Sequence, residues 1–408
     1  MTKRDEKGQS LFVMGADMNI IDYLGSEFQT LDERPLGDVD SLVLACLSYY
    51  RLPRSARGAR GGKGCELHRM YRAEWFENMT RDLWDPEGLI RLLAAAIASP
   101  RLRGVRLSDF VDETDGEAEK QFAACTLRFP SGDAYVSFRG TDNSLVGWKE
   151  DLNMAFEADV PSQRSAVSYL ERVASTVPGK LYVGGHSKGG NLAVYAAMSC
   201  SEPVFERIEK VFSHDGPGFT AEALASADFA ARSGKVSKTV PESSLIGMMF
   251  EQQEPYSVVC STASGFLQHD PFSWVVEGTD FARADSVSRG AALLDRTLNQ
   301  WISGTSRADR AGFVNALFSI LSAPGEDTFS GLKGNLSETV PVMFSQFTDL
   351  SAEQRGYLVH AIWGLVKAFG PDVDLSAVSR VFSGLGLGDD SSASDDSPSG
   401  STGPTDIL

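Results

Sequence analysis

Hydrophobic and polar residues change their spacing along the chain, and this spacing predicts the order of helices and strands. Apolar residues recur at helical intervals over residues 38–50 and again over residues 86–99, which predicts two N-terminal helices. Two β-rich runs, at residues 122–129 and 133–138, are joined by a Pro-Ser-Gly turn. Two such runs joined by turn residues predict a β-hairpin.

The middle of the chain alternates between helical and strand-like segments. A helix is predicted from residue 161 to about 176, and helical spacing recurs at 219–232. Strands are predicted at residues 180–183, 210–213 and 235–240. This alternation implies an α/β fold, with a mostly parallel, doubly wound sheet and flanking helices. Ligands of such sheets bind at the carboxyl ends of the strands.

The same patterns divide the chain into four parts. We expect residues 1–15 to be a flexible N-terminus and residues 16–285 to form the α/β domain together with the N-terminal helices. Residues 286–385 have helical spacing, at 291–302, 311–321 and 352–369, and form a helical region that can bind a protein partner. Residues 386–408 are rich in Ser, Gly and Asp and are predicted to be disordered.

Composition restricts the partners and the compartment. The net charge of −17 argues against nucleic acid or an anionic membrane as the main partner. No apolar run approaches the roughly 20 residues of a membrane span, and the first residues resemble no signal peptide, so we expect a cytoplasmic protein. The five scattered cysteines indicate reduced thiols and no metal site. A basic, Gly-rich stretch between Arg51 and Arg72 is interpreted as a solvated loop, with an anion site as the alternative.

The most informative motif is Gly-Gly-His-Ser-Lys-Gly-Gly at residues 184–190. It follows a short strand-like run and opens a helical run at 191–200, as a nucleophile elbow does. Gly185 and Gly189 fit this motif because a Cβ at either position would collide with a neighbouring strand or helix. The elbow would expose Ser187 at a helix N-terminus, where backbone N–H groups can bind an oxyanion. The alternatives are a simple connecting turn and a phosphate loop, whose Gly-x4-Gly-Lys-Ser/Thr order is absent.

A serine nucleophile needs a base, and the five histidines allow elimination. In doubly wound hydrolases the order along the chain is nucleophile, acid, histidine, so His68 is excluded. The His186 side chain is expected to point away from the Ser187 side chain. His360 lies on a predicted helix with apolar neighbours and is interpreted as a packing residue. His214 ends a strand beside Asp215 and is a less favoured base, because a side chain there has little freedom to reach across. His269 lies in a loop after the last β-rich run and is the predicted base.

Two carboxylates are candidates for the acid that orients His269. Asp215 follows the strand at 210–213, and Glu242 follows the strand at 235–240. We favour Asp215 because a Gly-Pro-Gly turn fixes its backbone, and Glu242 stays the alternative.

The oxyanion is expected to bind two backbone N–H groups. One belongs to Lys188, directly after the nucleophile, and the other to Thr141, in the loop after the strand at 133–138. We expect Arg139 to support this loop by pairing with a carboxylate such as Asp151.

Several motifs resemble known hydrolases. The Phe-Arg-Gly-Thr run at 138–141, Trp148 with Asp151, and Gly-His-Ser-Lys-Gly-Gly at 185–190 resemble the fungal-type (class three) lipases. Together with residues 19–24, 215–219 and 268–274, they resemble more closely the Mbeg-like family of bacterial α/β-hydrolases, over roughly residues 18–285. The resemblance implies an α/β-hydrolase fold and a serine hydrolase mechanism. Lys188 departs from the leucine of the lipases, and it either favours an anionic substrate or pairs with a carboxylate.

The sequence therefore predicts a serine hydrolase that acts on a carboxylic ester or a lipid-like acyl substrate. Ser187, His269 and Asp215 would form the triad, with an acyl-enzyme intermediate and without a metal or an organic cofactor. A catalytically inactive binding protein of the same fold is the alternative. A thioesterase or acyltransferase would use the same triad.

Overall fold

The computed structural model describes most of the chain. It describes residues 3–4, 10–11, 18–53, 64–154, 156–157, 159–225, 227–250, 255–292, 296, 299, 304–334 and 336–358. Several sequence predictions lie wholly or partly outside the described residues: the N-terminus at 1–15, part of the basic stretch, His360, the tail at 386–408, and parts of the helices at 291–302 and 352–369.

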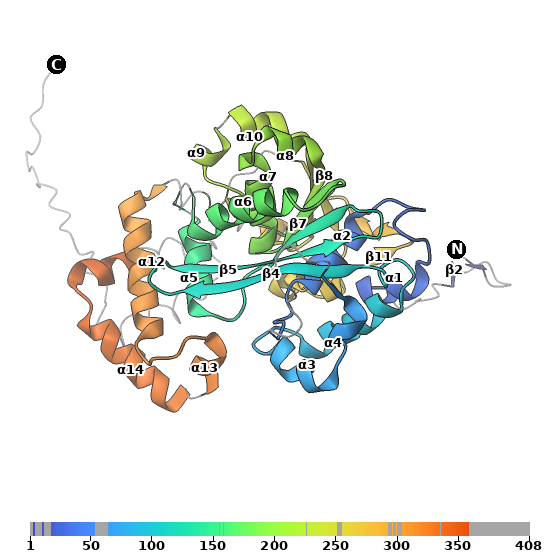
Figure 1. Ribbon diagram of the computed structural model, residues 1–408. Helices are drawn as coiled ribbons and strands as arrows, with labels where there is room; N and C mark the ends of the chain where they lie inside the picture. The colour runs from blue at the N-terminus through green and yellow to red at the C-terminus, as the bar shows by residue number, and fades with distance from the viewer. Residues whose placement is uncertain are drawn as a thin grey trace, which may run out of the picture.

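A large mixed sheet forms the centre of the molecule (Figure 1). Among the described residues it has nine strands, in the order β13-β10-β9-β8-β7-β6-β5-β4-β3. The strands from β6 to β10 run parallel, and the flanking pairs are antiparallel. Their bounds are β3 Cys65–Glu66, β4 Arg106–Asp115, β5 Lys120–Arg128, β6 Ala134–Phe138, β7 Leu181–His186, β8 Ile208–His214, β9 Val236–Pro241, β10 Tyr256–Val259 and β13 Arg283–Ala284. The short pairs β1 (Lys3–Arg4) with β2 (Ser10–Leu11) and β11 (Val276–Glu277) with β12 (Asp280–Phe281) lie outside this sheet.

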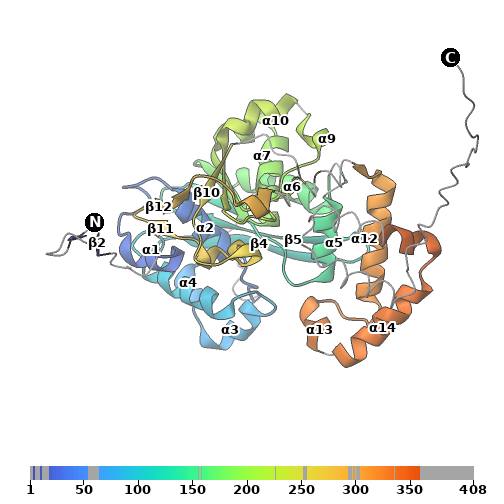
Figure 2. The same ribbon diagram turned by 180° about the vertical axis from the view of Figure 1, so that it is seen from behind.

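Helices cover both faces of the sheet. Figures 1 and 2 show α6, α7 and α10 on one side and α1, α3 and α4 on the other. The bounds are α1 Ile20–Ser26, α2 Asp38–Leu47, α3 Ala73–Thr80, α4 Pro86–Ala98, α5 Leu145–Asn153, α6 Pro161–Ala174, α7 Lys188–Ser199, α8 Glu202–Arg207, α9 Ala221–Leu224, α10 Ala227–Arg232, α12 Arg307–Ser322, α13 Phe329–Gly334 and α14 Leu336–Asp349. The predicted α/β-hydrolase fold is confirmed, and the helices of its second face come from the N-terminal segment.

Two hydrophobic cores lie on the two faces because successive strand residues point to opposite sides. On β6, Val136 packs with α6 and α7, whereas Tyr135 packs with α2 and α4. On β8, Val211 belongs to the core with α6 and α7, and Phe212 belongs to the core with α2 and α4. Strands buried on both faces are typical of the parallel part of an α/β sheet.

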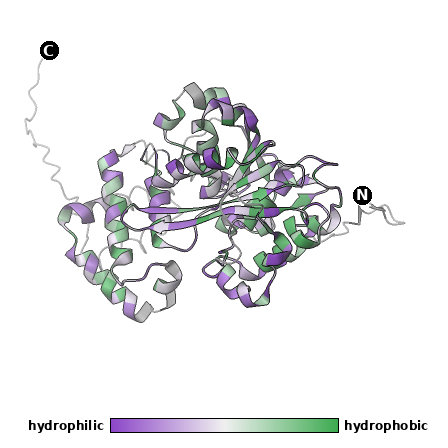
Figure 3. Cartoon of the chain, viewed as in Figure 1, coloured by the Kyte–Doolittle hydropathy of each residue, from purple (hydrophilic) through white to green (hydrophobic). Residues whose placement is uncertain are grey.

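The predicted hairpin at 122–138 is confirmed as β5 and β6, but β4 was missed. The first half of β4 is buried, while its second half runs into the exposed, hydrophilic end of the β4–β5 hairpin (Figure 3). A strand that changes from buried to exposed along its length lacks the regular alternation by which strands are recognised.

The C-terminal helices attach next to α5. Leu145 on α5 packs with Val314 and Phe318 of α12, and the Leu145 N–H donates to the Asp327 carbonyl at 2.8 Å. The separation of this region at residue 286 stays a prediction. Among the described residues, no helix is both long and apolar enough to cross a membrane.

Candidate active site

The parallel strands end at one edge of the sheet and bring distant residues together there. Phe138 of β6 pairs with Gly185 of β7, and His186 of β7 pairs with His214 of β8. The residues that follow these strands, including Thr141, Ser187 and Asp215, therefore leave the sheet at neighbouring positions. This is the edge at which α/β sheets bind ligands.

Ser187 occupies a strained turn between β7 and α7. Its φ of 59° and ψ of −135° are rare for a residue with a side chain. A Cβ on Gly185 would lie 2.3 Å from the carbonyl carbon of Gly189, and a Cβ on Gly189 would lie 2.1 Å from the Phe138 oxygen. The expected reason for both glycines is confirmed. The turn places the partly exposed Ser187 at the N-terminus of α7, where the first N–H groups have no intrahelical acceptor.

His269 and Asp215 form a short hydrogen bond. The distance from His269 Nδ1 to Asp215 Oδ2 is 2.6 Å, and Asp215 is fully buried while the His269 side chain is 22% exposed. A carboxylate accepts, so Nδ1 carries the proton and Nε2 is left with its lone pair. This is the tautomer that a general base for serine requires. Among the described residues, no hydrogen bond joins the Ser187 hydroxyl to His269.

The second oxygen of Asp215 is held by the segment after β9. The Ser244 hydroxyl and the Gly247 N–H, the latter at 3.1 Å, donate to Asp215 Oδ1. Glu242 lies in the same segment, and its backbone carbonyl accepts from the Ser288 N–H at 2.6 Å. Sequence reasoning missed Ser244 and Gly247, for which the only signal was their place after a strand.

His186 connects the elbow to the segment of His269. Its Nε2 lies 2.9 Å from the His269 carbonyl oxygen, and its Nδ1 lies 3.1 Å from the Tyr49 hydroxyl. Because a carbonyl only accepts, Nε2 carries the proton and Nδ1 accepts from Tyr49. Burial lowers the pKa of His186 well below its usual range, so the ring is neutral. Sequence reasoning set His186 aside as a base and missed this contact.

His214 is buried and engaged on both sides of its ring. Its Nδ1 lies 2.7 Å from the Thr239 hydroxyl, and its Nε2 lies 2.9 Å from the Ser41 hydroxyl. Burial lowers the pKa of His214 to about 4. With both nitrogens occupied, His214 stabilises the contact between α2 and the sheet.

The loop after β6 lies directly against the elbow. A Cβ on Gly140 would come within 3.1 Å of the Ser187 Cβ, and the Thr141 hydroxyl is hydrogen-bonded to Asp151 Oδ2. Arg139 pairs with Asp112 at 2.8 Å and with Asp142 at 3.4 Å. The expected pairing of Arg139 with a carboxylate is confirmed, and Asp142 lies in the same loop. Asp151 as the partner is wrong, because the guanidinium points to Asp112 on β4 and to Asp142.

Lys188 turns its side chain into the protein. Only 1% of the side chain is exposed, and its ammonium lies 2.7 Å from Glu150 Oε2 and 3.5 Å from Asp151 Oδ1. The second explanation of this lysine, pairing with a carboxylate, is the one that the structure supports.

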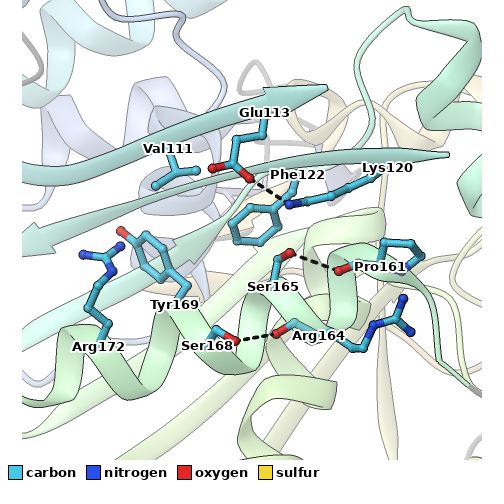
Figure 4. A pocket seen from close by; sticks show the side chains of 10 residues that line it. All are labelled: Val111, Glu113, Lys120, Phe122, Pro161, Arg164, Ser165, Ser168, Tyr169 and Arg172. Carbon is cyan, nitrogen blue, oxygen red and sulfur yellow. Dashed lines mark hydrogen bonds and ion pairs between the residues drawn. The ribbon is translucent and has the colours of Figure 1, made fainter. Parts of the chain in front are cut away.

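A groove of about 510 Å³ lies away from this site, between the β4–β5 hairpin and α6 (Figure 4). Figure 4 shows Glu113 paired with Lys120, whose ammonium lies 5.7 Å from the centre of the Phe122 ring. Its lining residues are Val111, Glu113, Lys120, Phe122, Pro161, Arg164, Ser165, Ser168, Tyr169 and Arg172. None of them belongs to the predicted site. In the part of the chain that the structure describes, no cluster of His, Cys, Asp and Glu suits a metal ion.

Comparisons with known proteins point to one family. The family model described as Mbeg1-like matches residues 96–319. No curated protein matches the sequence.

Similar solved structures include three lipases. A Rhizomucor miehei lipase propeptide complex is 16% identical, with a TM-score of 0.29, over 42% of this chain and 59% of that one. The chain thus matches less than two thirds of that protein. M37 lipase is 14% identical, with a TM-score of 0.29, over 50% of this chain and 68% of the other. A triacylglycerol lipase from Penicillium expansum is 12% identical, with a TM-score of 0.28, over 43% of this chain and 74% of that one.

Proposed function

The chain belongs to the Mbeg1-like family, and from the residues gathered around its elbow we propose that it is a serine hydrolase of carboxylic esters or lipid-like acyl compounds. The observation that carries the proposal is the 2.6 Å hydrogen bond between His269 and the buried Asp215, at the same sheet edge as Ser187. An isolated elbow could be a simple turn. An elbow beside a histidine with an oriented tautomer has the parts of a triad.

In the proposed first step, His269 Nε2 removes the proton of the Ser187 hydroxyl as the oxygen attacks the acyl carbon. Asp215 keeps the ring oriented and stabilises the imidazolium that forms. The imidazolium then donates the proton to the leaving alkoxide, which yields the acyl-enzyme and the free alcohol. A water, deprotonated by His269 in the same way, releases the acid and restores Ser187.

Two backbone N–H groups are proposed to bind the oxyanion of both tetrahedral intermediates. The Lys188 N–H is the first of α7 and is supported by the helix dipole. The Thr141 N–H belongs to the loop that lies against the elbow, and the hydrogen bond to Asp151 fixes its side chain. Removing one such donor usually costs about 100- to 1,000-fold in kcat.

The residues around His269 support an apolar acyl group. Phe266 is 52% exposed and Leu267 is 69% exposed, and the Phe266 ring stacks 6.1 Å from the His269 ring. Trp84, 41% exposed, lies 6.4 Å from the His186 ring and donates to Asp270, the neighbour of His269 in the chain. The Lys188 ammonium is buried against Glu150, so it does not favour an anionic substrate.

The direct test is labelling by a fluorophosphonate probe together with hydrolysis of p-nitrophenyl butyrate. Ser187→Ala should abolish both, because it removes the nucleophile and little volume. Ser264→Ala, which changes an exposed serine just before the His269 segment, is the matched control and should keep both. Equal labelling of Ser187→Ala and wild type would refute the nucleophile. Labelling without ester hydrolysis would favour a thioesterase or an acyltransferase.

A further inference from the structure

The Lys188 side chain contacts the machinery expected to hold the oxyanion. We propose that it is a positioning group that keeps Asp151 as a carboxylate, and that this carboxylate fixes the Thr141 hydroxyl and its loop. The proposal rests on the proposed function, since its readout is turnover at Ser187. It concerns the side chain alone and is separate from the Lys188 N–H.

Each of the three protons of the Lys188 ammonium has an acceptor. The ammonium donates to the Gln121 carbonyl at 2.9 Å, to Gln121 Oε1 at 3.2 Å and to Glu150 Oε2 at 2.7 Å. Asp151 Oδ1, at 3.5 Å, is therefore bound by charge alone. In this buried setting the attraction is larger than between exposed groups.

The two carboxylates depend on Lys188 to different degrees. Glu150 also accepts from the Gln121 N–H at 2.9 Å, the Ser162 N–H at 2.8 Å and the Ser162 hydroxyl at 2.6 Å. Asp151 accepts from the Thr141 hydroxyl at Oδ2, and its buried Oδ1 accepts no hydrogen bond among the described residues. Loss of the ammonium would thus leave Glu150 with three hydrogen bonds. Asp151, whose side chain is 23% exposed, would keep only the hydrogen bond from Thr141 and would lose the cation that offsets its partial burial.

Opposing effects set the pKa of Asp151, and their sum raises it above its usual value. Burial raises the pKa of Asp151, the nearby Glu150 raises it too, and Lys188 and the Thr141 hydroxyl lower it. The titratable groups around Asp151 are Lys188 on α7, Glu150 on α5 and the buried phenol of Tyr49, whose pKa is raised by burial. Without Lys188, the pKa of Asp151 rises further and the carboxyl takes up a proton as the pH falls.

A protonated Asp151 no longer orients Thr141. An ionised carboxylate can only accept, so it holds the Thr141 hydroxyl in one direction, whereas a carboxylic acid has its own proton to donate. Gly140, the neighbour of Thr141, is packed against the Ser187 Cβ, so a loosened loop changes the geometry at the reacting carbonyl. Small displacements of this kind reduce kcat more than substrate binding.

The test is a double-mutant cycle in a Glu150→Gln background, which removes the second carboxylate that Lys188 neutralises. In this background, Lys188→Met should lower kcat for p-nitrophenyl butyrate about 30-fold at pH 6 and leave KM within about twofold. At pH 9 the loss should shrink to about threefold, because a higher pH favours the ionised form of Asp151. When Asp151→Asn is also present, Lys188→Met should change kcat less than about twofold, because the two act in series.

Lys149→Met in the same background is the matched control. The Lys149 side chain is 20% exposed and pairs with Glu119 at 2.7 Å. This variant should give the kcat of the background at both pH values. The proposal would be overturned if the loss of kcat caused by Lys188→Met were the same at both pH values. It would also be overturned if that loss were equal with and without Asp151→Asn.

A second measurement keeps the proposal testable if Lys188→Met does not fold, as judged by circular dichroism. Asp151→Asn alone should lower kcat about 30-fold with KM within about twofold, and wild-type turnover would overturn the role. If the wild-type protein itself is not labelled by the fluorophosphonate, the proposed function and this role fail together. Additive losses in a labelled, active enzyme refute only the role of Lys188.

Discussion

Replacing Asp215 with asparagine keeps the shape of the side chain and removes the charge that faces His269. One oxygen of Asp215 accepts from His269 Nδ1, and the other accepts from Ser244 and from the Gly247 N–H. An asparagine has a single acceptor oxygen, and the Gly247 N–H can only donate, so we expect this oxygen to stay with Ser244 and Gly247. The NH2 group then faces His269, which has to accept at Nδ1 and carry its proton at Nε2.

The consequence is a base with its proton on the wrong nitrogen. The same substitution in a Ser-His-Asp protease lowers kcat about 10⁴-fold. We expect a comparable loss for Asp215→Asn, which corresponds to about 5.5 kcal/mol at about 1.4 kcal/mol per factor of ten. Because the asparagine keeps the hydrogen bonds to Ser244 and Gly247, the free energy of unfolding should change by only about 1 kcal/mol.

The assay combines kcat and KM for p-nitrophenyl butyrate with the rate of fluorophosphonate labelling and a thermal unfolding curve. Glu242→Gln is the matched control, since Glu242 is the other acid compatible with the order of residues along the chain. A kcat of Asp215→Asn within about threefold of wild type would refute the tautomer argument. A large loss in Glu242→Gln instead would assign the acid to that position.

Two further predictions concern the buried histidines. His186→Phe keeps an aromatic ring beside Trp84 and removes the donor to the His269 carbonyl. We expect kcat to fall about tenfold with KM within about twofold, and the loss of kcat in Tyr49→Phe to be smaller. Equal losses of kcat in the two variants would contradict a positioning role of His186. The pKa of His214 is about 4 in the folded protein and about 6.5 in the unfolded protein, so the unfolded state binds the proton first as the pH falls. The free energy of unfolding therefore decreases by up to about 3 kcal/mol between about pH 6.5 and about pH 4. Urea unfolding at pH 7 and pH 5 should therefore show a smaller difference for His214→Gln than for wild type, whereas a variant of the exposed His68 should match wild type.

Local features of the fold were predictable because they depend on neighbours in sequence. The elbow needs glycines at 185 and 189 to avoid collisions within one strand-turn-helix unit, and this requirement is visible in seven residues. The alternation of helix and strand, with Pro and Gly at the ends of elements, likewise predicted the sheet. The β4 strand was not predicted from the sequence because its outer half is polar and exposed.

Contacts between distant segments were less predictable. Asp215 and His269 are 54 residues apart, and the order along the chain allowed Glu242 equally well. The roles of Asp215 and His269 stay a prediction, although the hydrogen bond between them is present. The partners of Lys188 depend on how α5 and β5 meet α7, and nothing near Lys188 in the sequence indicates Glu150.

The position of α2 has a consequence for synthesis. This apolar helix is buried against strands that come much later in the chain: Ser41 contacts Tyr135 94 residues on and His214 173 residues on, and Asp38 pairs with Arg283 245 residues on. At a translation rate of about 5 to 20 residues per second, the ribosome needs on the order of 10 to 30 s to complete the strands on which α2 packs. During that time a helix with nine of its ten residues destined for burial has no sheet to cover it. Until β8 has emerged, the apolar side chains of α2 therefore lack part of the sheet on which they pack.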